Sequence, residues 1–155
     1  MRIILTINGK KREFDVELEK SLLDLLREAG YMSVKDGCRE GECGACTVIM
    51  NGKTVNSCML LAVQADGSEI LTVEGLGTPD NPHPIQEAFV EAAGVQCGFC
   101  IPGKILSTKY LLDKNPDPSE EEIKKALSGN LCRCTGYVKQ IDAVKLAAKK
   151  LKQAK

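Results

Sequence analysis

Apolar and polar residues alternate in the first part of the chain, as they do in β-strands. Two runs carry apolar residues at every second position: Ile3, Leu5 and Ile7, then Phe14, Val16 and Leu18. Between them lies Asn8-Gly9, a pair that favours a type I′ hairpin turn because both residues tolerate positive φ. The pattern therefore predicts a β-hairpin at the start of the chain.

A short helix and a second hairpin are predicted next. Ser21 suits a helix N-cap, and the leucine-rich segment after it ends at Gly30, a residue typical of the position beyond a helix. After a loop at 36–46, apolar segments at 47–50 and 54–56 flank a second Asn-Gly turn, and a last strand is expected at 70–73. A helix packed on such a small mixed sheet is an α+β arrangement.

Beyond residue 75 the apolar pattern changes to the period of a helix. Residues 75–84 contain two glycines and three prolines, which predict a linker. Four helical segments are expected after it, at about 85–94, 102–112, 119–127 and 136–152. The second half is therefore predicted to be a small four-helix domain.

Charge and the N-terminal segment narrow the class of protein. The 155 residues carry 21 basic and 21 acidic side chains, so the net charge points neither to nucleic acid nor to a membrane surface. The apolar run at residues 3–7 is too short for the core of a signal peptide, and no stretch is long enough to span a membrane. We expect a cytoplasmic protein, in which the eight cysteines bind metal rather than form disulfides.

Four cysteines of the first half have the spacing of a particular metal site: Cys38, Cys43, Cys46 and Cys58. C-x4-C-x2-C with one distant partner is the plant-type [2Fe-2S] ferredoxin spacing. Three glycines, Gly37, Gly41 and Gly44, permit the tight turns that wrap backbone N–H groups around a cluster. Zinc is the competing interpretation, but four-cysteine zinc sites usually contain two C-x2-C knuckles and this segment has one.

The other four cysteines lie in two loops of the second half: Cys97, Cys100, Cys132 and Cys134. Both loops directly precede a predicted helix. Helix N-termini present unpaired N–H groups and the positive end of a dipole, which favour thiolates and an anionic cluster. We expect a second cluster here, although the spacing taken alone also permits zinc.

Three segments together resemble one known family. They are GCREGECGACTV at 37–48, QCGFCIPG at 96–103 and CRCTGY at 132–137. In this order they are similar to the iron–sulfur subunit or domain of the xanthine oxidase family of molybdenum hydroxylases, and the resemblance covers nearly the whole chain. One departure is Ile101, where much of the family has Thr; this change leaves the cysteines in place.

The resemblance implies a fold and a set of ligands. The implied fold is an N-terminal β-grasp ferredoxin-like domain at 1–76, followed by a C-terminal four-helix bundle domain at 77–155, each holding one [2Fe-2S] cluster on its four cysteines. It also implies that Gln96 hydrogen-bonds the pterin of a molybdopterin cofactor. Cys134 matches the cluster ligand closest to that cofactor.

The resemblance also implies partners and a direction of electron flow. A large molybdopterin-binding subunit would carry out hydroxylation, so that no substrate binds to this chain and no catalytic residue lies on it. Electrons would pass from molybdenum to the second cluster, then to the first, and then to FAD on a probable medium flavin-binding subunit or to another acceptor. Two alternatives depend on the cysteines alone: a free two-cluster ferredoxin-like carrier, and a zinc-stabilised interaction module.

A few further residues have two interpretations each. His83, the one histidine, is expected to be an ordinary exposed linker residue rather than a ligand. Arg39 and Arg133 lie beside cysteines, where they either tune a cluster or contact a partner, or simply form surface ion pairs. The acidic first loop, with Glu40 and Glu42, fits either a docking surface for a basic partner or solvated loop charges.

Overall fold

The structure is a computed structural model that describes residues 1–154. Five strands form one sheet in the order β2-β1-β5-β3-β4. Their bounds are Arg2–Ile7 for β1, Lys10–Asp15 for β2, Thr47–Met50 for β3, Lys53–Asn56 for β4 and Glu69–Leu71 for β5. Both Asn-Gly pairs have positive φ at each residue, so the two hairpins and their turns are as predicted.

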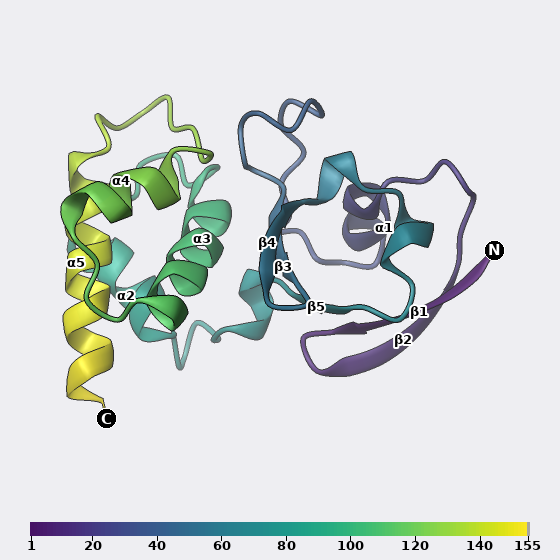
Figure 1. Ribbon diagram of the computed structural model, residues 1–155, viewed down its shortest axis with the longest axis horizontal. Helices are drawn as coiled ribbons and strands as arrows, with labels where there is room; N and C mark the ends of the chain where they lie inside the picture. The colour runs from purple at the N-terminus through teal and green to yellow at the C-terminus, as the bar shows by residue number, and fades with distance from the viewer. Residues whose placement is uncertain (155) are drawn as a thin grey trace.

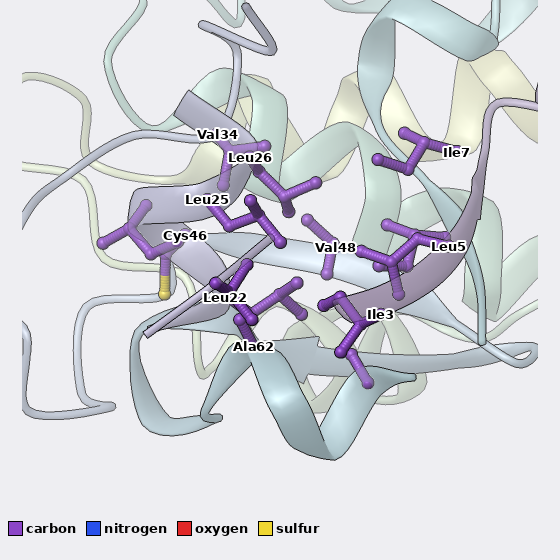
Figure 2. Close-up of a cluster of buried hydrophobic side chains, with 14 residues drawn as sticks. Ile3, Leu5, Ile7, Leu22, Leu25, Leu26, Val34, Cys46, Val48 and Ala62 are labelled. Carbon is purple, nitrogen blue, oxygen red and sulfur yellow. The ribbon is translucent and has the colours of Figure 1, made fainter. Parts of the chain in front are cut away.

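The central strand β5 joins the two hairpins into one sheet. It runs parallel to β1 and antiparallel to β3. The Asn8 side chain holds the residue after β5 in place. Its amide donates to Thr72 Oγ1 and its carbonyl oxygen accepts from Thr72 N, both at 2.9 Å. Helix α1 (Leu22–Glu28) packs on this sheet, with Ser21 as its N-cap. Figure 2 shows the resulting apolar cluster, including Leu22, Leu26 and Val48, with Cys46 at its margin.

Two strands are shorter than the alternating pattern predicts. β2 ends at Asp15, and Leu18 is 63% exposed. The reason is that β1 is its only neighbour in the sheet, and Val16 N already bonds to the carbonyl of Met1, so no partner strand remains beyond that point. β5 ends at Leu71 because the chain turns into a 3₁₀ segment at Val73–Gly75.

Four α-helices form the second half. They are α2 (Pro84–Glu91), α3 (Ile101–Lys114), α4 (Glu120–Leu127) and α5 (Val138–Gln153). α2 packs on α5 and α3 packs on α4, around a second apolar core that includes the fully buried Phe89 and Val144. No helix of residues 1–154 is both long and apolar enough to cross a membrane.

Two of these helices begin at side-chain caps. Ser119 and Glu122 form the predicted capping box of α4. His83 is half-buried rather than exposed, since its Nδ1 accepts a hydrogen bond from Ile85 N at 3.2 Å and caps α2. The histidine therefore has a structural function in the helix start that the linker composition did not reveal.

The two halves lie side by side, with the chain termini at opposite ends of the molecule (Figure 1). Helix α3 faces β3 and β4 across the junction. A Cβ atom at Gly103 of α3 would lie 2.4 Å from the carbonyl oxygen of Gly44. Only a residue without a side chain allows this approach, and it brings the first cysteine loop against the helical half.

Candidate metal centre

All eight cysteines are free, and the structure arranges their side chains in four pairs. The pairs are Cys38 with Cys43, Cys46 with Cys58, Cys97 with Cys134, and Cys100 with Cys132. In the second of these, the sulfur atoms are 3.3 Å apart, well beyond the disulfide bond length of about 2.05 Å. Two pairs lie in each half of the chain, as the sequence grouping predicts.

Backbone N–H groups point at the sulfurs of the first group. Cys38 Sγ accepts from the N–H groups of Glu40 at 3.4 Å and Cys43 at 3.5 Å, and Cys43 Sγ accepts from Ala45 N at 3.5 Å. Cys58 lies on the 3₁₀ segment Ser57–Met59 directly after β4. The loop therefore surrounds its thiols with donors that favour negative charge on sulfur.

The glycines of this loop are required by its geometry. Gly41 and Gly44 have φ values of +77° and +72°, which residues with a side chain rarely adopt. A Cβ atom at Gly37 would lie 2.8 Å from Cys43 Sγ. The tight wrapping expected from the sequence is thus present.

Arg39 fixes the position of the same loop. Its guanidinium binds Asp24 at 2.8 Å and Asp36 at 2.6 Å, so that α1 and the cysteine loop are joined. Of its two interpretations, the structure favours the ion pair. The hydrogen bond from Arg39, with a second one from Ser21, lowers the pKa of Asp24 below its usual range.

The second group lies at the N-terminal ends of α3 and α5, as predicted. Cys100 directly precedes α3, and Cys132 Sγ accepts from Thr135 N at 3.4 Å and Thr135 Oγ1 at 3.2 Å. Gln140 of α5, whose side chain is fully buried, donates from Nε2 to Cys100 Sγ at 3.7 Å and to the Gly94 carbonyl at 3.3 Å. Cys100 is therefore held by a donor from α5, and Cys132 by a residue of its own loop.

Within each group, the thiols differ in acidity. Burial raises the pKa of Cys46 and of Cys100 to about 11. Backbone donors, first Cys43 and then Glu40, lower the pKa of Cys38 to about 7. Burial opposes ionisation of Cys132, but hydrogen bonds from Thr135 lower its pKa to about 6. Each group thus contains a cysteine that favours the thiolate, the form that binds iron.

The donor set fits a [2Fe-2S] core better than a single ion. A zinc site needs its four ligands to converge on one position, whereas the thiols of each half lie as two separate pairs. A [2Fe-2S] core contains two irons, each bound to two protein sulfurs. Two cysteine pairs in each half supply that arrangement.

The second group opens to the surface on one side. Cys97 and Cys134 are exposed, as is Gln96 beside them, whereas Cys100 is buried. Nearby exposed apolar side chains are Phe99, Leu131, Tyr137 and Val138. Gln96 is therefore adjacent in the chain to the exposed pair Cys97 and Cys134.

Two buried residues near the cysteines, Asn130 and Lys104, could not be recognised from the sequence pattern. Asn130 is buried at the junction of the halves, and its Nδ2 donates to the Gly44 carbonyl at 3.1 Å and to Thr47 Oγ1 at 3.3 Å. Lys104 is fully buried on α3, one turn after Cys100. From sequence alone, a lysine on a helix is expected to be solvated, so only the tertiary packing reveals that Lys104 is buried.

The sheet, the helices and the paired thiols define an iron–sulfur protein of the [2Fe-2S] class. Comparison with known families agrees: residues 5–72 match a 2Fe-2S iron–sulfur cluster binding domain, and residues 72–145 match a [2Fe-2S] binding domain. Both halves of the chain therefore match families that bind this type of cluster.

Comparison with individual proteins identifies the family more closely. The chain is 57% identical over 149 residues to the nicotinate dehydrogenase small FeS subunit of Eubacterium barkeri, covering 96% of this chain and 95% of that one. It is 48% identical to the aldehyde oxidoreductase of Megalodesulfovibrio gigas over 94% of this chain, which is 16% of that longer protein. The quinoline 2-oxidoreductase structure from Pseudomonas putida 86 covers 99% of this chain and 96% of that one, with 44% identity and a TM-score of 0.94.

The chain therefore belongs to the family of iron–sulfur subunits of molybdenum hydroxylases. Its work is electron transfer within a multi-subunit oxidoreductase.

Proposed function

We propose that the chain holds two [2Fe-2S] clusters and conducts electrons from a large molybdopterin-binding subunit to a flavin-binding subunit or another acceptor. The proposed ligands are Cys38, Cys43, Cys46 and Cys58 for the first cluster, and Cys97, Cys100, Cys132 and Cys134 for the second. A [2Fe-2S] cluster supplies reversible one-electron chemistry, with a potential set by the surrounding protein. The chain itself positions the thiols and joins the two sites.

One contact between the two cysteine loops carries the proposal. The carbonyl oxygen of Cys43 accepts a hydrogen bond from Leu131 N at 2.9 Å, and Leu131 directly precedes Cys132. One backbone hydrogen bond therefore connects a ligand residue of the first site to the neighbour of a ligand residue of the second. An electron carrier needs such proximity between its sites, whereas a chain that used metal only to stabilise two domains would not.

The open side of the second site supports an orientation towards the molybdopterin subunit. Gln96 and Cys134 are exposed, and so are the apolar side chains of Phe99 and Val138, which lie near the cysteines of this site in the chain. Exposed apolar clusters of this kind mark interaction sites. We assign this side to the large subunit, with Gln96 as the pterin contact.

The proposal includes the type and the bounds of the two domains. The five-stranded sheet with α1 supports a β-grasp domain at residues 1–76. The pairing of α2 with α5 and of α3 with α4 supports a four-helix bundle at residues 77–155.

Metal analysis of the native complex tests the function. The full chain is expressed with its neighbouring subunits, purified by a tag on this chain, and assayed for iron, acid-labile sulfide, zinc and molybdenum, with EPR after reduction. We expect four irons and four sulfides per chain, two distinct [2Fe-2S] signals and co-purifying molybdenum. The same clusters without molybdenum or partners would instead identify a free carrier, and zinc without sulfide would refute both.

The pterin contact has its own test. Gln96→Ala should slow reduction of both clusters by substrate while iron and sulfide contents stay constant. Gln153→Ala, an exposed glutamine at the end of α5, is the matched control. Unchanged reduction of the Gln96→Ala complex would remove Gln96 from the site.

A further inference from the structure

Lys104 is a buried charge that the ligand set does not explain. Among residues 1–154, it is the one charged side chain in the buried class, with an exposed fraction of 0%. It lies in the first turns of α3, and its backbone N–H bonds to the Cys100 carbonyl at 3.2 Å. The side chain therefore starts one helical turn from a cysteine of the second group.

The neighbours of the Lys104 ammonium that it bonds or stacks with are neutral. Its Nζ donates to the backbone carbonyl of Asn130 at 2.6 Å and lies 4.8 Å from the centre of the Tyr137 ring. The Tyr137 hydroxyl in turn accepts a hydrogen bond from Cys132 N at 3.0 Å. Lys104 is thus held by the residues that flank the Cys132 loop, with no carboxylate among the groups that influence its charge.

A buried ammonium needs a negative partner, because desolvation strongly disfavours an isolated charge. Burial lowers the pKa of Lys104, and the thiols of Cys100 and Cys132 oppose this effect. These two cysteines form one of the pairs of the second site. The negative partner of Lys104 is therefore the sulfur set itself.

We propose that Lys104 is the fixed counter-charge of the second cluster and raises its reduction potential relative to a neutral residue at this position. The inference rests on the proposed function, since it takes Cys100 and Cys132 as cluster ligands. Reduction adds one negative charge to the cluster, and a nearby buried cation stabilises that charge more than it stabilises the oxidised form. A higher potential at the second site makes it a better acceptor for electrons from the large subunit.

Two neutral substitutions separate charge from hydrogen bonding. Lys104→Met removes both, whereas Lys104→Gln keeps a donor for the Asn130 carbonyl. Lys114→Met is the matched control, because Lys114 lies on the same helix over its own tyrosine ring, 4.2 Å from the centre of Tyr110. Each variant is purified as the full complex and titrated with dithionite while EPR follows the two cluster signals. A Cys134→Ser variant identifies the second cluster through the change in its g-values.

Both neutral variants should lower the equilibrium constant for reduction of the second cluster at least tenfold, or about 59 mV for one electron. The equilibrium constant for reduction of the first cluster should change by less than threefold. Lys114→Met should change the equilibrium constant of neither cluster. Unchanged titration of the second cluster in Lys104→Gln, or equal shifts of both clusters, would overturn the inference.

Loss of the second signal in both neutral variants would also overturn it, because the inference assigns Lys104 to the potential and not to assembly. Wild-type protein without two clusters would instead overturn the proposed function.

Discussion

At the scale of single residues, the buried hydroxyl of Thr108 is a weak point of the fold. It is fully buried on α3, and its Oγ1 has no hydrogen-bond partner among the described residues. Such a group retains the desolvation penalty without compensation. We expect Thr108→Val to raise the free energy of unfolding by about 1 kcal/mol, measured from the urea midpoint of the full chain.

Thr47→Val is the matched control for this change. Thr47 is also buried, but its Oγ1 donates to the Gly44 carbonyl at 2.7 Å and accepts from Asn130. The same substitution should therefore lower stability by about 1–3 kcal/mol. Equal effects at the two positions would mean that the Thr108 hydroxyl has a partner in solution.

Prediction from sequence at the residue scale is possible where chemistry and spacing coincide. The cysteine groups and the glycines between them follow from loop geometry that is local in the chain. Lys104 and Asn130 lie outside such patterns, because their roles depend on contacts such as that of Asn130 with Gly44, 86 residues apart. A single sequence contains no periodic signal for a contact of that separation.

At the scale of elements, the approach of α3 to the first cysteine loop depends on Gly103. A Cβ atom there would lie 2.4 Å from the Gly44 carbonyl and 2.9 Å from Asn130 Nδ2. Gly→Ala in an exposed helix stabilises by about 1 kcal/mol, but here the helix would be displaced from the loop. We expect Gly103→Ala to destabilise the chain by about 1–3 kcal/mol, measured by urea unfolding.

Gly129→Ala provides the comparison for Gly103→Ala. A Cβ atom at Gly129 would have no neighbour within 4 Å, so its effect should stay within about 0.5 kcal/mol. Similar effects of the two substitutions would show that the helix can move without loss.

The ion pair that joins α1 to the cysteine loop should make the stability of the chain depend on pH. The Asp24 pKa is lowered by Arg39, so the pair stabilises the fold above the usual carboxyl pKa of about 4. That contribution is lost as pH falls below this value. In Asp24→Asn, cluster absorbance should fade faster than in wild type at pH 6, and the difference should shrink as pH falls below about 4.

The size of this effect is limited because the ion pair is partly exposed, so we expect less than about 1 kcal/mol at neutral pH. Asp15→Asn, which changes an exposed carboxylate on β2, should fade at the wild-type rate throughout. A difference between Asp24→Asn and wild type that stays constant as pH falls below about 4 would contradict the role of the charge.

Elements were predictable where their ends have local causes. Both hairpins follow from Asn-Gly turns, and the cap of α4 follows from Ser119 and Glu122. The ends of β2 and β5 do not, because β2 stops where its neighbour β1 stops and β5 stops where the chain turns into the 3₁₀ segment at Val73–Gly75. The alternation of apolar residues therefore continues to Leu18, although the strand itself ends at Asp15.

At the scale of the whole molecule, each half has its own apolar core, and the junction between them is polar. The first core draws on residues up to Ile70, and the second on residues from Ile85 onwards. Asn130 is central to the junction, since it bonds to Gly44 and Thr47 of the first half and accepts from Ser107 Oγ of α3 at 2.7 Å. The halves are therefore joined by specific hydrogen bonds more than by a shared apolar core.

This arrangement predicts that the two halves can be uncoupled without unfolding either. Asn130→Ala removes the hydrogen bonds to Gly44 and Thr47 of the first half and takes away the acceptor of the buried Ser107 hydroxyl of α3, at a cost of about 2 kcal/mol. Calorimetry of the full chain should then show two transitions where wild type shows one. Asn115→Ala should lower the transition temperature without splitting it, because the Asn115 side chain bonds only to Asp117 and Glu122 within the helical half. A single transition in Asn130→Ala would mean that the backbone bond from Leu131 to Cys43 and the packing of Gly103 on Gly44 suffice to hold the two sites together.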